Sequence, residues 1–124
     1  MEKFIKIVFK SVPILWIIKR FSFLLKSMGI IPKGRWFHRL PVSDWIAVKL
    51  SNGKNVWLKN TGFNLEKSLY WRGSQGYESL TMELIEKIVP VCDWFIDVGA
   101  NSGYFSIVAS AINSKLRVVA FEPI

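Results

Sequence analysis

The stretch FIDVGANSGYFS (residues 95–106), followed by VAFEP (residues 119–123), decides the fold of this chain. Residues 94–98 form a short apolar run that is typical of a strand in a parallel sheet. A glycine-containing loop follows it, then apolar residues at helical spacing over 104–112. A second apolar strand is predicted over 116–121. The order of strand, loop, helix and strand predicts a βαβ unit of an α/β sheet.

The loop and the acid beyond the second strand predict a nucleotide site. Gly99 and Gly103 allow the backbone to approach a ligand closely, where a Cβ would clash. The N-terminus of the following helix offers unpaired N–H groups and a partial positive charge. Glu122 follows Gly99 at close to the roughly 20 residues expected for an acid that accepts the hydroxyls of a ribose.

Two common nucleotide motifs do not fit this loop. The dehydrogenase pattern G-x-G-x-x-G fails because Asn101 and Tyr104 stand where glycines are needed, and the phosphate loop fails because Tyr104 follows Gly103. A tight pyrophosphate cradle is therefore disfavoured. Asp97, just before the loop, suits a cationic ligand better than a phosphate. S-adenosylmethionine carries an ammonium and a sulfonium and no phosphate.

These residues resemble the FkbM-type S-adenosylmethionine-dependent methyltransferases. The first motif of that family reads D-[VI]-G-A-N-x-G and the second ends in Phe-Glu-Pro, and the likeness covers residues 77–124. It implies a doubly wound, Rossmann-like class I methyltransferase sheet with S-adenosylmethionine as cofactor. It also implies an O-methyltransferase acting on a hydroxyl of a sugar or natural product, so the partner would be a small-molecule or glycan acceptor.

The resemblance assigns cofactor-binding positions to Asp97, Gly99, Asn101, Gly103, Glu122 and Glu78. Asp97 and Gly99 would line the methionine part, Asn101 and Gly103 would shape the loop, and Glu122 would hold the ribose. Glu78 matches an acid that precedes the first helix of the family. The family continues well beyond the ribose acid, so we expect an incomplete domain, a truncated gene product or a fragment, that is inactive alone. No catalytic residue is assigned.

The front of the chain is strongly basic. The net charge of +8 divides into +10 for residues 1–60 and −2 for residues 61–124. Residues 1–32 are apolar with interspersed lysines. The longest uncharged run of this segment, Ser11–Ile18, is too short to span a membrane. We predict basic amphipathic helices, restarted at Pro13, that either lie on an anionic membrane surface or pack on their own domain. Nucleic acid is disfavoured.

Composition limits the class of protein further. Apolar residues make up 51% of the chain and charged residues only 21%, which excludes a disordered chain. A single cysteine, Cys92, and a single histidine, His38, exclude a disulfide scaffold and a zinc site, so we expect no metal. We expect a cytoplasmic protein, peripheral on the inner face of the membrane if the basic helices bind lipid. The alternative to an enzyme is a non-catalytic fragment that binds a membrane surface or a partner.

Residues 33–76 are interpreted as a linker and hairpin region. Alternating apolar residues around Asn52-Gly53 predict a hairpin over residues 45–59, because both turn residues tolerate a positive φ. Residues 60–76 carry few periodic signals and are interpreted as a loop packed on the domain. Residues 79–89 predict a helix whose apolar stripe comprises Leu84, Ile85, Ile88 and Val89.

Overall fold

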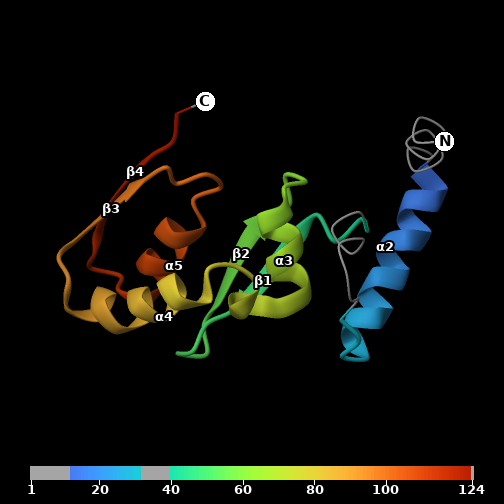
Figure 1. The fold of residues 1–124 in the computed structure, drawn as a ribbon, viewed down its shortest axis with the longest axis horizontal. Coiled ribbons are helices and arrows are strands. Elements are labelled where there is room, and N and C mark those ends of the chain that lie inside the picture. Colours follow the sequence, from blue (N-terminus) through green and yellow to red (C-terminus); the bar gives the residue numbers. More distant parts are fainter. Residues whose placement is uncertain (1–11, 32–39, 124) are drawn as a thin grey trace.

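The computed structural model describes residues 12–31 and 40–123, and this part of the chain is a small α/β structure. Figure 1 shows three groups along the longest axis: a parallel sheet with two helices, a hairpin with one helix, and a separate helix at the far end. The helices are α2 (Val12–Ser27), α3 (Asn64–Arg72), α4 (Ser79–Ile88) and α5 (Tyr104–Ile112). The strands are β1 (Trp45–Lys49), β2 (Asn55–Lys59), β3 (Trp94–Val98) and β4 (Arg117–Phe121), and the 3₁₀ turns are η2 (Gly73–Gly76) and η3 (Val89–Val91).

The predicted hairpin is confirmed. Strands β1 and β2 pair antiparallel, and the pairs Ile46–Leu58 and Val48–Val56 are buried. Only Gly53 of the two turn residues has a positive φ, 81°. The Gly53 N–H donates to the carbonyl of Leu50 at 3.0 Å, so three residues close the turn. Loops of this length need one residue in the left-handed region rather than two.

The interpretation of residues 60–76 as a loop is wrong, because helix α3 occupies the middle of this segment. Leu65, Leu69, Tyr70 and Trp71 of α3 are buried, and the helix packs against β1. The usual start signal is missing, because the N-cap residue is Phe63, which offers no side-chain cap. The burial of its apolar residues against the hairpin therefore accounts for the helix better than its local sequence does.

Helix α4 is confirmed, but its buried side differs from the predicted stripe. Ile85 and the following Val89 are buried as expected, whereas Leu84 and Ile88 are exposed. Met82 takes their place in the core, because it faces Tyr104 of α5.

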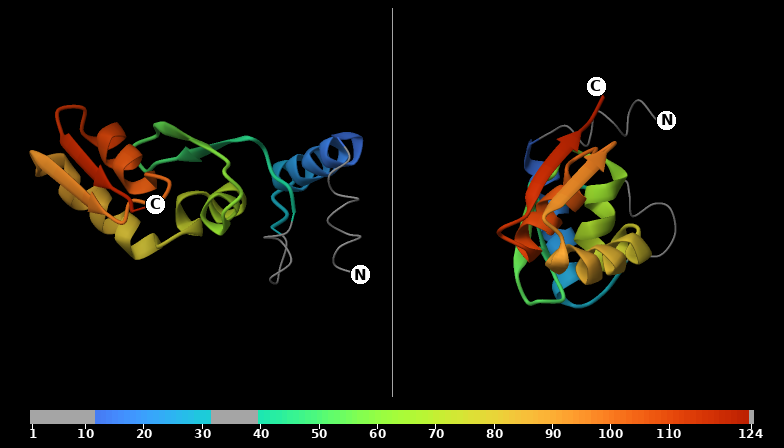
Figure 2. Two further views of the ribbon diagram at one scale, coloured as in Figure 1. Left: turned by 90° about the horizontal axis from the view of Figure 1, so that it is seen from above. Right: turned by 90° about the vertical axis from the view of Figure 1, so that its left-hand side faces the viewer.

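The predicted βαβ unit is confirmed. Strands β3 and β4 pair parallel, with Trp94 opposite Arg117 and Val98 opposite Phe121. Helix α5 packs on one face of this sheet, and α4 lies beside α5 (Figure 2). The other face carries exposed apolar side chains, among them Ile96 and the 80% exposed Val98.

One continuous core joins the hairpin to α3, α4 and α5. Its buried residues are Val42, Ile46, Val48, Leu50, Val56, Leu58, Leu65, Leu69, Tyr70, Trp71, Met82, Ile85, Val89, Tyr104, Val108 and Ala109. The hairpin is thus central to the packing that holds α5, and α5 in turn positions the loop after β3.

Helix α2 begins at Val12, which agrees with a helix restarted at Pro13, and Gly29 follows its end with φ 71°. Residues 1–11 of the predicted basic amphipathic segment and residues 33–39 of the predicted linker lie outside the described residues. Within the described ranges, no helix is both long and apolar enough to cross a membrane.

Candidate functional site

The predicted loop lies at the end of β3 and is anchored to the neighbouring strand. The N–H groups of Gly99 and Ala100 both donate to the carbonyl of Phe121, at 2.8 and 3.0 Å. A further bond from Gly103 N–H to the carbonyl of Ala100, at 2.7 Å, closes the loop before α5 begins. The loop therefore sits at the carboxyl edge of the parallel strands, where open α/β sheets bind ligands.

Glu122 is joined directly to this loop. Its Oε2 accepts a hydrogen bond from the backbone N–H of Asn101 at 2.6 Å, a short distance typical of a charged acceptor. Its other oxygen, Oε1, has no hydrogen-bond partner among the described residues. One oxygen thus fixes the acid against the loop while the other stays available to a ligand.

Asp97 is held from the helix side of the sheet. The hydroxyl of Ser106, a largely buried residue of α5, donates to Asp97 Oδ2 at 2.7 Å. This contact fixes the carboxylate between β3 and α5. The sequence analysis quoted Ser106 within the motif but gave it no role.

Backbone strain is concentrated at the predicted positions. Within the described residues, Glu78 and Asn101 are the non-glycine residues with a positive φ, 40° and 49°. Both belong to the set predicted from the sequence. A non-glycine residue in this region costs on the order of 1–3 kcal/mol, and such residues cluster at binding and active sites. Gly99 and Gly103 also have positive φ, 79° and 74°.

The space above the loop is open. A Cβ placed on Gly99 or Gly103 would meet no atom within 4 Å, so no protein group fills the position next to either glycine. In the same loop the hydroxyl of Ser102 is buried without a hydrogen-bond partner. A buried hydroxyl of this kind is normally paired, so Ser102 is a candidate ligand contact that the sequence did not reveal.

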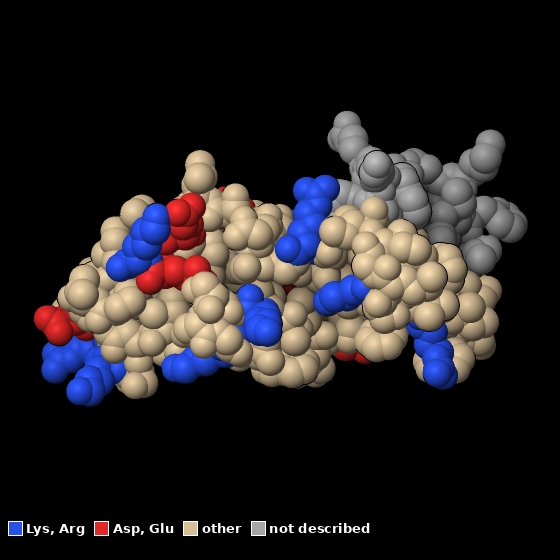
Figure 3. Space-filling model, turned by 90° about the horizontal axis from the view of Figure 1, so that it is seen from below, with Lys and Arg blue, Asp and Glu red and all other residues tan. Residues whose placement is uncertain are grey.

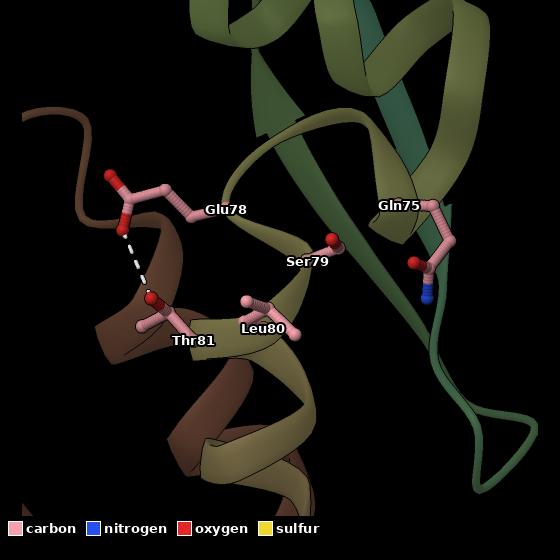
Figure 4. Close-up of a pocket in the computed structure, with 5 residues that line it drawn as sticks. All are labelled: Gln75, Glu78, Ser79, Leu80 and Thr81. Atoms are coloured by element: carbon pink, nitrogen blue, oxygen red, sulfur yellow. Dashed lines mark hydrogen bonds between the residues drawn. The ribbon is translucent and has the colours of Figure 1, made fainter.

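Glu78 lies beside the loop rather than in it. Its Oε2 accepts a hydrogen bond from the hydroxyl of Thr81 at 3.2 Å, and it lines an open depression of about 400 Å³ with Gln75, Ser79, Leu80 and Thr81 (Figure 4). In that view the Glu78 side chain points toward the brown ribbon, which comprises α5 and the segment before it. The depression is lined by none of the other predicted site residues.

Tyr77, the residue before Glu78, links this acid to α5. Burial raises the pKa of the neighbouring Tyr77 phenol, and the hydrogen bond and negative charge of Glu78 raise that pKa further. The Tyr77 ring lies 6.1 Å from the ring of Phe105, centroid to centroid, which ties the start of α4 to the first turn of α5.

The structure thus brings five predicted residues to one loop, namely Asp97, Gly99, Asn101, Gly103 and Glu122, and places Glu78 at its side. No three His, Cys, Asp or Glu residues of the described part are grouped so that they could hold a metal ion. Comparison of the chain with protein-family models, curated proteins and solved structures found no match.

Proposed function

We propose that this chain binds S-adenosylmethionine at the loop of residues 99–103 and forms the cofactor-binding part of an FkbM-type O-methyltransferase. In this proposal β3 and β4 are the first parallel strands of a doubly wound, Rossmann-like sheet, and the enzyme acts in the cytoplasm. The acceptor is a hydroxyl of a sugar or natural product. The observation that carries the proposal is the 2.6 Å contact between Glu122 and Asn101, because it joins the two motifs in one geometry.

The residues present fit this cofactor. Asp97 directly precedes the open loop and Glu122 contacts it, and two carboxylates near one loop suit a ligand with a cationic amino-acid end and a diol. Glu122 Oε1 is available to the ribose hydroxyls. The open space beside both glycines leaves room for close backbone approach, and the hydroxyl of Ser102 in the same loop has no hydrogen-bond partner among the described residues.

The cofactor, when bound, supplies an electrophilic methyl group on its sulfonium. The residues described here bind and orient it, and positioning of this kind can account for a large share of the acceleration in a direct transfer. Asp97 is kept in place by Ser106, and Glu122 by the Asn101 N–H. No described residue is assigned as the base that removes the acceptor proton.

Ligand discrimination tests the proposal. Isothermal titration calorimetry of the chain with S-adenosylmethionine, S-adenosylhomocysteine, NAD⁺ and ATP separates a methyl-donor site from a phosphate site. We expect binding of the first two and none of the phosphate-bearing nucleotides, because two carboxylates flank the loop. Equal binding of NAD⁺ or ATP would show that the loop belongs to another nucleotide class.

A further inference from the structure

The side of α2 that faces the protein combines polar contacts with the half-buried Leu15, Ile18 and Leu25. The hydroxyl of Ser22, which is fully buried, donates to the carbonyl of Pro41 at 2.9 Å. Lys19 forms an ion pair with Asp44 at 2.6 Å, and the ammonium of Lys26 lies 4.2 Å from the centroid of the Tyr70 ring. Burial lowers the pKa of Lys26. These contacts hold α2 against the protein, while its aromatic side chains stay exposed.

The opposite side of α2 is apolar and exposed. Residues spaced alternately by three and four form one line along a helix. This line, here called the outer stripe, comprises Ile14, Ile17, Phe21 and Leu24 of α2 and Met28 just beyond its end. Ile17 is 59% exposed, and Phe21 and Leu24 are each 53% exposed. The large rings of Trp16 and Phe23 are also exposed. A contiguous apolar surface of this kind marks an interaction site.

The position of α2 leaves this stripe accessible to a large partner. Figures 1 and 2 both place α2 at one end of the longest axis, away from the sheet formed by β3 and β4. The candidate loop of residues 99–103 belongs to the other end. A partner that binds α2 therefore does not need to approach the loop.

Charge indicates what that partner is. Residues 12–31 contain Lys19, Arg20 and Lys26 and no acidic residue. Arg20 is exposed, lies 4.7 Å above the Trp16 ring, and forms no ion pair within the described ranges. In Figure 3 the acidic groups on the visible face lie mainly at the end opposite α2. A second copy of α2 would bring no acidic residue to Arg20, whereas an anionic bilayer supplies the opposite charge.

We propose that α2 lies in the surface plane of an anionic membrane, with the outer stripe in the headgroup–acyl boundary. Trp16 and Arg20, on the flank of the stripe, then sit at the headgroup level, where amphipathic aromatic and cationic side chains are stable. The proposal is independent of the methyltransferase assignment, because no residue of the loop takes part in it.

Co-sedimentation of the full chain with vesicles tests the proposal. We expect binding to phosphatidylcholine vesicles that contain phosphatidylglycerol, little binding to phosphatidylcholine alone, and weaker binding at raised salt. The double variant Phe21→Ser, Leu24→Ser should bind more than about tenfold more weakly, because it removes two large apolar side chains from the stripe. Arg20→Gln should cost about fivefold, the effect of one charge near such a surface.

Matched controls use exposed residues on another element. Leu80→Ser with Leu84→Ser removes two exposed apolar side chains of α4, and Lys115→Gln removes an exposed cation. Neither should change vesicle binding, and circular dichroism checks that every variant folds. Equal loss in the α4 variant would overturn the proposal, as would equal binding to both kinds of vesicle. Absence of binding together with a dimer that the Phe21→Ser, Leu24→Ser variant abolishes would assign the stripe to a second copy.

Discussion

Replacing Glu122 by alanine removes both contacts that the proposal gives to its carboxylate. The substitution removes the 2.6 Å contact to the Asn101 N–H and also the free Oε1 that the proposal gives to the ribose. A hydrogen bond to a charged group contributes about 1.5–3 kcal/mol when its partner is shielded, and less when it is exposed. Because Glu122 is exposed, we expect a loss of about 1–3 kcal/mol in S-adenosylmethionine binding, or roughly 5- to 150-fold in Kd.

The assay is calorimetric titration of the ligand into the wild type and two variants. Glu122→Gln keeps an acceptor for the Asn101 N–H while removing the charge, so its affinity should fall between those of the wild type and Glu122→Ala. The control is Glu83→Ala, an exposed acid paired with Lys87 on α4. An unchanged Kd in Glu122→Ala, or an equal loss in the control, would refute the ribose assignment.

Three other outcomes follow from the geometry. Asn101→Gly should keep the loop and the fold's stability, whereas Asn101→Val should lower the free energy of unfolding in urea by about 1–2 kcal/mol, because a β-branched residue resists a positive φ. Burial, with the nearby charge of Glu86, raises the pKa of Tyr104 to about 12. The stability that its neutral phenol contributes is therefore complete below pH 10 and lost as pH rises from 10 to about 12, a loss that Tyr104→Phe should remove from alkaline denaturation curves. The exposed apolar sheet face should bind an environment-sensitive dye, and Ile96→Thr with Val98→Thr should reduce that fluorescence; unchanged fluorescence would place the dye elsewhere.

The parts of the fold that the sequence predicted are those with strong local signals. The hairpin has alternating apolar residues around a glycine turn. The strands β3 and β4 are continuous apolar runs, and α5 between them has apolar residues at helical spacing. Helix α3 was missed because it starts at an uncapped Phe63 and is flanked by glycines. Its stability comes from contacts with the distant hairpin, and no local pattern encodes those contacts.

The candidate site likewise has features that the local sequence predicts and features that depend on tertiary packing. The loop, Asp97 and Glu122 follow from residue types and spacing, because turns and strand ends are local features. The buried hydroxyl of Ser102 and the bond from Ser106 depend on how α5 packs under the sheet. The positive φ of Glu78 likewise depends on how the start of α4 is packed, so none of these three features could be predicted from the sequence.

The unequal packing of the two sheets predicts unequal amide hydrogen exchange. Both sheets have two strands and are covered on one face, but the covered residues of the hairpin are fully buried, whereas those of β3 and β4 are only half-buried. Amides in the hairpin should therefore exchange through global unfolding, and those of β3 and β4 through smaller openings. The loop of residues 99–103 follows β3 and is hydrogen-bonded to the end of β4, so it is attached to these less protected strands. A ligand that binds the loop would therefore slow amide exchange in β3 and β4 first. This local protection would be measurable at ligand concentrations too low to change the stability of the whole chain.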